Sequence, residues 1–170
     1  FATVIADANG DWSLELDEGQ LQEGLSQISA RVVQSDGSVS AFSPTVRYTL
    51  DTTAPARPDV PQVVSTVLDN GTGVLLSNQK NLILSGTIES SDSSIRLLID
   101  GKLIAELQQE GRTQWIYTLS GLQEGDHSIQ VQYQDKAGNL SLPSEPLTYR
   151  LDLTAPDQPA PPEWGTGSDS

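Results

Sequence analysis

Carboxylates are the side chains of this 170-residue sequence that are best suited to chemistry. Asp and Glu together number 23 against 9 Lys and Arg, which gives a formal net charge of −14. So acidic a chain repels phosphate backbones and anionic lipids, and we expect no nucleic-acid partner and no direct membrane insertion. Ca²⁺ is bound by six to eight oxygen ligands, many of them carboxylates, so the composition favours a structural Ca²⁺ site.

The other reactive residue types are scarce. The chain has no Cys, which excludes thiolate metal sites and disulfides, and it has a single histidine, His127. Nothing in the sequence supports a catalytic triad around His127, and we expect this residue on the face of a strand. Phosphate-binding glycine loops, nucleophile elbows and His-Glu-x-x-His motifs are absent from the sequence. We therefore predict that the chain is not an enzyme, with no catalytic residue and no organic cofactor.

The acidic motifs recur along the chain at a fixed spacing. Asp-x-Thr-Ala-Pro stands at 51–55 and again at 152–156, and Leu-Gln-Glu-Gly stands at 21–24 and again at 122–125, which gives a period of 101 residues. Further pairs with this period are Ser40 and Ser141, Ser43 and Ser144, and Tyr48 and Tyr149. Self-similarity at a fixed period indicates an array of like units, and a period near 100 suits a whole sandwich domain.

The repeat predicts how the chain is divided. Residues 1–50 are expected to form the C-terminal half of one module, 51–55 a linker, and 56–151 a complete second module. Residues 152–170 are expected to be a second linker and the start of a third module, because their prolines suit an extended segment or an edge strand.

Strand patterns fill the complete module, with no helical period. Ile129, Val131 and Tyr133 alternate with glutamines, which predicts a strand with one buried and one wet face. Asp100-Gly101 between two apolar runs indicates a tight hairpin. The seven predicted strands are 60–68, 81–88, 94–99, 102–108, 115–119, 127–134 and 140–151. This pattern is typical of an all-β fold, a tandem array of antiparallel Greek-key β-sandwiches.

The motifs together resemble those of a known family. The Asp-x-Thr-Ala-Pro boundaries, the Leu-x-Glu-Gly motif, a Trp in each copy (Trp12, Trp115) and Asp-x-Ala-Gly-Asn-x-Ser at 135–141 are similar to those of bacterial immunoglobulin-like repeats of giant surface adhesins. These adhesins are Ca²⁺-dependent and type I-secreted. The resemblance implies immunoglobulin-like sandwiches at the bacterial cell surface, with neighbouring modules of the same chain as partners. It also implies a spacer role in adhesion or biofilm formation, any host or surface ligand being bound by a domain outside this sequence. Both Trp residues are expected to be core anchors.

Alternating strand directions sort the acids between the two ends of the complete module. At the first junction the predicted Ca²⁺ ligands are Asp51, Asp92, Asp135 and Asn139, joined by Glu23 of the preceding module. At the second junction they are Asp69, Glu124 and Asp152, joined by ligands from a third module. Crowded carboxylates repel one another until a cation neutralises them, so a bound ion would stiffen each junction. Turn formation remains the alternative, because Asp before Thr and the residues 135–139 are also ordinary turn chemistry.

Two other functions remain open at the level of sequence. One is a glycan- or protein-binding sandwich module, which would present exposed aromatic residues peculiar to one repeat. The other is an accessory domain of a secreted hydrolase, whose catalytic domain would lie elsewhere. The leading prediction is a structural extender segment of a bacterial cell-surface adhesin, stiffened by Ca²⁺ at the inter-module junctions.

Overall fold

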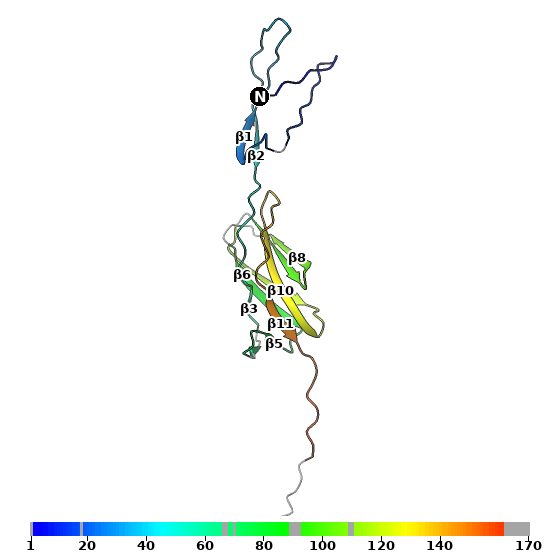
Figure 1. Cartoon of the computed structure of the whole chain (residues 1–170). Helices are drawn as coiled ribbons and strands as arrows, with labels where there is room; N and C mark the ends of the chain where they lie inside the picture. Colours follow the sequence, from blue (N-terminus) through cyan, green and yellow to red (C-terminus); the bar gives the residue numbers. More distant parts are fainter. Residues whose placement is uncertain are drawn as a thin grey trace, which may run out of the picture. The chain divides into compact units, whose positions relative to one another are not determined.

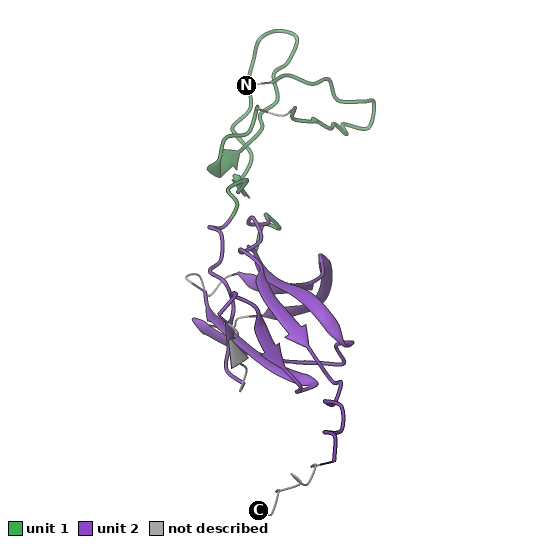
Figure 2. Cartoon of the chain, turned by 60° about the horizontal axis from the view of Figure 1, so that its bottom comes forward, with its two compact units in different colours: residues 1–54, 136–139 green, residues 55–135, 140–170 purple. Residues whose placement is uncertain are grey.

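The computed structural model describes residues 2–17, 19–65, 68–69, 71–88, 93–108 and 111–161, without the side chains of Leu68 and Asp69. The chain divides into two compact units, which are drawn in different colours in Figure 2. Unit 1 comprises residues 1–54 and 136–139, and unit 2 comprises residues 55–135 and 140–170. Within the described ranges the regular structure is entirely β, and no helix there is long and apolar enough to cross a bilayer.

Unit 2 is a β-sandwich of a three-stranded and a six-stranded sheet (Figure 1). The smaller sheet has the order β3 (Gln62–Val63), β6 (Asn81–Thr87), β9 (Gln114–Ser120). The larger sheet has the order β4 (Leu68–Asp69), β5 (Leu75–Ser77), β11 (Leu147–Leu151), β10 (Gly125–Gln134), β7 (Ser94–Ile99), β8 (Lys102–Gln108). The predicted all-β sandwich is therefore confirmed, with one sandwich in the described part of the chain.

Side chains from both sheets meet in one apolar core. The smaller sheet contributes Leu82, Leu84, Trp115 and Leu119, and the larger sheet contributes Ile95, Leu97, Ile99, Ile129, Val131, Tyr133, Tyr149 and Leu151. The predicted alternation in β10 is confirmed, because its apolar residues are buried while the intervening glutamines are only partly buried. Burying this much apolar surface is the main driving force that holds the two sheets together.

The hairpin between β7 and β8 also follows the prediction. Asp100 and Gly101 form the turn, with φ angles of 51° and 76°. Two successive residues with positive φ suit the right-handed twist of the flanking strands, and Asp-Gly is among the few pairs that accept this conformation. This turn fixes the Asp100 side chain at the end of β7.

The predicted first strand, 60–68, is wrong as a single element. Its residues are divided between β3 in the smaller sheet and β4 in the larger one, and β5 forms a further, unpredicted strand that runs parallel to β11. The segment lacks a strict alternation of apolar and polar residues, so its sequence specifies neither one register nor one sheet.

The predicted last strand, 140–151, is regular only from Leu147. Upstream of it Ser141 and Ser144 each use their backbone and side chain to complete the pairing with β10. Ser144 donates its amide to the Val131 carbonyl at 2.8 Å, and its hydroxyl oxygen accepts the Val131 amide at 3.1 Å. Ser141 makes the same pair of bonds to Tyr133, at 2.9 Å each. Pro143 lies between the two serines and has no amide hydrogen for a continuous ladder, so the hydroxyls complete it.

Unit 1 contains a two-stranded sheet of β1 (Gly24–Ile28) and β2 (Val46–Leu50). Its register, Gly24 opposite Leu50, is that of Gly125 opposite Leu151 shifted by the repeat period. Ser43 and Ser40 also bond to Ala30 and Val32 as their counterparts do in unit 2. The internal repeat of the sequence therefore corresponds to a repeated hydrogen-bond pattern.

The prediction of a core position is confirmed for Trp115 and wrong for Trp12. Trp115 is 4% exposed, whereas Trp12 is 55% exposed. Trp115 lies between two sheets, while the described part of unit 1 offers Trp12 only one two-stranded sheet. An equivalent sequence position therefore does not become a core position without an opposing sheet.

Replacing Ser144 with Ala removes the acceptor of a buried main-chain amide, that of Val131. We expect the free energy of unfolding of the sandwich to fall by about 1–3 kcal/mol, the usual cost of an unpaired buried donor. Urea denaturation followed by circular dichroism measures it. Ser43→Ala is the matched control, because it removes the same bond at an exposed site and should change stability by less than about 0.5 kcal/mol. Equal losses in the two variants would contradict this account.

Candidate functional site at the repeated linker motifs

In each repeat, strand register places the Leu-Gln-Glu-Gly motif beside the Asp-x-Thr-Ala-Pro motif. In unit 2 the first residue of β10, Gly125, lies opposite the last residue of β11, Leu151. The residue before β10 is Glu124, and the Asp-x-Thr-Ala-Pro motif begins directly after β11. In an antiparallel pair these two positions are neighbours, so the glutamate can reach the threonine of the motif.

In unit 1 the Glu23 carboxylate accepts several hydrogen bonds from the two threonines that follow β2. The Thr52 hydroxyl donates to it at 2.7 Å, the Thr52 amide at 3.1 Å, and the Thr53 hydroxyl at 3.2 Å. Asp51 closes a local turn, since its Oδ1 accepts the Thr53 amide at 3.1 Å. We call the bonds between Glu23 and these threonines the first Glu–Thr contact.

In unit 2 the same arrangement recurs around Thr154. Its hydroxyl donates to the Glu124 carboxylate at 2.6 Å, and its amide donates to Asp152 Oδ1 at 3.0 Å. The Asp152 amide in turn donates to the Ser77 carbonyl at 3.0 Å, which attaches the start of the motif to β5. We call the bond between Glu124 and Thr154 the second Glu–Thr contact. Leu153 stands where the first motif has Thr52, so the second contact lacks that hydroxyl donor.

The first contact stabilises the ionised form of its glutamate. The hydroxyl of Thr52, and next its amide, hold the pKa of Glu23 below its usual value, with Thr53 and Asp51 acting in the same direction and desolvation acting against them. Hydrogen bonds from neutral donors to a carboxylate favour its charged form. Because Glu23 is exposed, solvent screens the electrostatic contribution of these hydrogen bonds to stability. Their main result is a fixed orientation of the segment 51–55 that follows β2.

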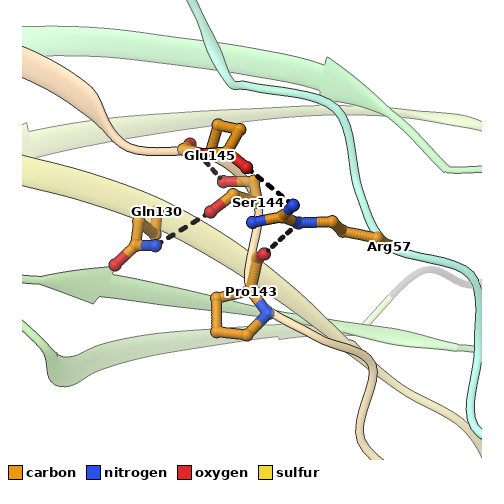
Figure 3. A network of polar contacts seen from close by, with 5 residues as sticks. All are labelled: Arg57, Gln130, Pro143, Ser144 and Glu145. Atoms are coloured by element: carbon orange, nitrogen blue, oxygen red, sulfur yellow. Dashed lines mark hydrogen bonds and ion pairs between the residues drawn. The ribbon is translucent and has the colours of Figure 1, made fainter.

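The start of unit 2 is anchored by Arg57, two residues after the first motif. Its Nε donates to the Pro143 carbonyl at 2.6 Å, and its Nη1 lies 2.7 Å from Glu145 Oε1 (Figure 3). Gln130 of β10 donates to the Ser144 carbonyl at 2.8 Å, so the segment that receives Arg57 is itself fixed. The pair is largely exposed and adds little stability, but within unit 2 it attaches the residues around Arg57 to the segment before β11.

Of the ligands predicted for the first junction, the structure places three within unit 1. Glu23 and Asp51 flank the threonines, and Asn139 donates from Nδ2 to the Asp51 carbonyl at 2.9 Å. Asp135 belongs to unit 2, and Asp92 lies outside the described residues.

Of the ligands predicted for the second junction, two meet at Thr154. These are Glu124 and Asp152, while Asp69 is part of β4 and its side chain is not described. An open cavity of about 740 Å³ borders Asp152 and Thr154, and its lining combines apolar residues such as Leu76 and Ile83 with polar ones such as Asn78 and Gln79.

These groups are of the right chemical type for Ca²⁺, since carboxylate, carbonyl and hydroxyl oxygens are its ligands. Each motif offers two carboxylates, and no group of three or more Asp, Glu, His or Cys residues suited to hold a metal ion occurs among the described residues. A Ca²⁺ ion here would therefore take further oxygens from threonine hydroxyls, main-chain carbonyls and water.

Sequence reasoning selected the acidic residues and missed their partners. In the sequence Thr53 and Thr154 stand out only as parts of a boundary motif, and no pattern marks Arg57. The signal was present for the threonines, because a glutamate and a threonine recur together at the same period of 101 residues.

Comparison with known proteins gives the following likenesses. A family model described as a bacterial Ig-like domain matches residues 60–153. Fibronectin(III)-like modules of CbhA from Clostridium thermocellum align with a TM-score of 0.48 and 19% identity, covering 83% of this chain and 70% of theirs. The human OSCAR ligand-binding domain aligns with a TM-score of 0.40 and 18% identity, covering 70% of this chain and 62% of its own. No curated protein sequence gives a significant match.

Replacing Glu124 with Ala removes the acceptor of the Thr154 hydroxyl, so residues 152–155 should gain motion on the nanosecond timescale. We expect the ¹⁵N order parameter of the Thr154 amide to fall from about 0.85 towards 0.6. Glu23→Ala is the matched control, because it breaks only the first Glu–Thr contact and should leave Thr154 unchanged. An unaltered order parameter in Glu124→Ala would show that the contact does not order the segment.

Proposed function

Because the chain belongs to the bacterial Ig-like domain family, which its match over residues 60–153 shows, we propose that it is a structural extender of a bacterial cell-surface adhesin, supporting adhesion or biofilm formation. Bacterial Ig-like domains are commonly extracellular or surface domains, and Ig-like families are typically non-catalytic. The observation that carries the proposal is the recurrence of the Glu–Thr contact after both β2 and β11.

An extender needs linkers with a restricted orientation, because the end-to-end distance of a freely jointed chain is on average much shorter than its fully extended length. A flexible segment of a few residues samples many conformations, and each hydrogen bond to a folded module removes some of them. The Glu–Thr contact fixes a motif to the module that precedes it, and Arg57 fixes the chain to the module that follows the first motif. This is the arrangement expected for a spacer, and a ligand-binding surface would not require it.

Ca²⁺ at the motifs is a further part of the proposal. Glu23 and Asp51 at the first motif, and Glu124 and Asp152 at the second, supply carboxylates within one short segment each. An arriving ion would replace threonine donors with a full positive charge, and the released hydroxyl oxygens could then turn to serve as ligands. Such an ion would link the end of a module to its linker more firmly than neutral hydrogen bonds do. Asp69, Asp92, Asp135 and Asn139 remain predicted contributors of further oxygens.

Small-angle X-ray scattering and thermal unfolding of the 170-residue chain, with Ca²⁺ and with a chelator, test this proposal. We expect Ca²⁺ to narrow the distribution of overall dimensions that the chain samples. The maximum dimension of the molecule should not become shorter. At about 100 times its dissociation constant it should stabilise the bound unit by about 2.7 kcal/mol, visible as a higher unfolding temperature.

Asp51→Ala should abolish the Ca²⁺ response of the first motif and leave that of the second. Asp59→Ala is the control, because it removes the same charge from an exposed site close to the motif. Identical scattering and unfolding with and without Ca²⁺ would refute the stiffening by Ca²⁺. Dimensions of a freely jointed chain under both conditions would refute the extender itself.

A further inference from the structure

His127 contacts hydrogen-bond acceptors with both of its ring nitrogens. Nδ1 lies 2.9 Å from Asp100 Oδ2, and Nε2 lies 2.9 Å from the Gln123 carbonyl oxygen. The side chain is only 12% exposed, so water has little access to replace either partner. A carbonyl oxygen and a carboxylate cannot donate, and both bonds therefore require a hydrogen on each nitrogen, which only the imidazolium form has.

The carboxylate that faces Nδ1 is held in place by β10 itself. Asp100 Oδ1 accepts the Ser128 amide at 2.8 Å, while the Asp100 amide donates to the Ser128 carbonyl at 2.8 Å. The amide of Ser128 first, and His127 next, hold the pKa of Asp100 below its usual value. Asp100 therefore stays ionised at neutral pH and remains an acceptor.

The carbonyl that faces Nε2 belongs to the peptide group that joins Gln123 to Glu124. Its orientation sets the direction in which Glu124 leaves the main chain, and Glu124 is the acceptor in the second Glu–Thr contact. We propose that His127 is a positioning residue whose imidazolium form holds this peptide, so that the second Glu–Thr contact is regulated by protonation. This inference rests on the proposed function, because it assigns a regulation to one of the linkers of the extender.

Loss of one proton breaks the arrangement whichever nitrogen loses it. A neutral imidazole has one N–H, so either the Gln123 carbonyl or the Asp100 carboxylate would face a lone pair at 2.9 Å. Asp100 is tied to Ser128, whereas Gln123 lies in the irregular segment before β10. The segment 121–124 is therefore the part that moves, and Glu124 moves with it.

The charged groups around the ring favour its protonated form. Asp100 faces it from the β7–β8 turn, and Asp126 lies next to it in β10, where it pairs with Arg150 of β11 at 3.1 Å. Lys102 acts on Asp100 from β8, and Tyr149 of β11 lies opposite His127 in the register. Burial, the largest single effect, lowers the pKa of His127, but the Gln123 carbonyl, Asp100 and Asp126 all act in the opposite direction, and the net result is a pKa above 6.5.

The sign of the pH dependence follows from this raised pKa. The contribution of His127 to stability is complete below its unfolded value, near 6.5, and is lost as the pH rises through the higher folded value. Asp100 sets the lower limit of the pH range, because its contribution to stability is lost as the pH falls through its own depressed pKa. The contact is thus fixed below about pH 6.5 and is released as the pH rises through the higher pKa of His127 in the folded chain.

The first repeat provides an internal control. Ser26 occupies the position that is equivalent to His127 by the period of 101 residues, and His127 is the only histidine in the chain. The first Glu–Thr contact therefore has no imidazolium that holds the peptide before its glutamate. The order of this contact should not change over the same pH range.

NMR titration of the whole chain in the presence of a chelator tests the inference. The signals of the single histidine are unambiguous, and we expect a midpoint above 6.5 with both ring nitrogens protonated below it. The ¹⁵N order parameter of Thr154 should fall from about 0.85 to below about 0.6 through the same midpoint, while that of Thr53 stays constant. A midpoint at or below 6.5, or parallel behaviour of Thr154 and Thr53, would overturn the inference.

Two variants extend the test. His127→Gln should make the order parameter of Thr154 independent of pH between 6 and 9, and persistence of the dependence would overturn the inference. Asp100→Asn keeps the histidine and should lower its titration midpoint; an unchanged midpoint would overturn it even if His127→Gln fails to fold. Because Ca²⁺ is absent throughout, this result and the Ca²⁺ response of the extender can each fail without the other.

Discussion

The register between the last two strands of the sandwich is the constraint on which the Glu–Thr contacts depend. Gly125 lies opposite Leu151, so the residue before β10 and the residues after β11 are forced to be neighbours. Unit 1 repeats the pairing with Gly24 opposite Leu50. A shift of one residue would turn the core side chains of a strand to the other face, so burial of Ile129 and Tyr149 maintains this register. Core packing thereby determines where the Glu–Thr contacts form.

A large part of the fold was predictable from local patterns. The strands at 94–99 and 102–108 coincide with β7 and β8, because Asp-Gly between apolar runs specifies both a turn type and a register. The division of 60–68 between two sheets was not predictable, since its pattern is compatible with either sheet. Gly86 was also missed: a Cβ at this position would lie 2.7 Å from the Trp115 ring, a contact that only the folded structure defines.

The candidate site was predictable as a set of residues and not as a set of contacts. The repeat identified Glu23, Glu124, Asp51 and Asp152, but a carboxylate accepts a hydrogen bond from a threonine as readily as it binds a cation. The sequence thus identifies the carboxylate that accepts a hydrogen bond but does not identify the group that donates it. Which threonine meets which glutamate depends on strand pairing across about 30 residues, so it became visible only with the register.

Glutamates before β1 and β10 hold the segments after β2 and β11 by hydrogen bonds to threonines. A scalar coupling across such a hydrogen bond is the sharpest test. The Thr52 amide donates to the Glu23 carboxylate at 3.1 Å. A coupling between the Thr52 amide nitrogen and the side-chain carboxyl carbon of Glu23 should therefore be detectable in solution and should disappear in Glu23→Ala. Absence of this coupling in the unmodified chain, with Thr52 as mobile as a free linker residue, would contradict the account.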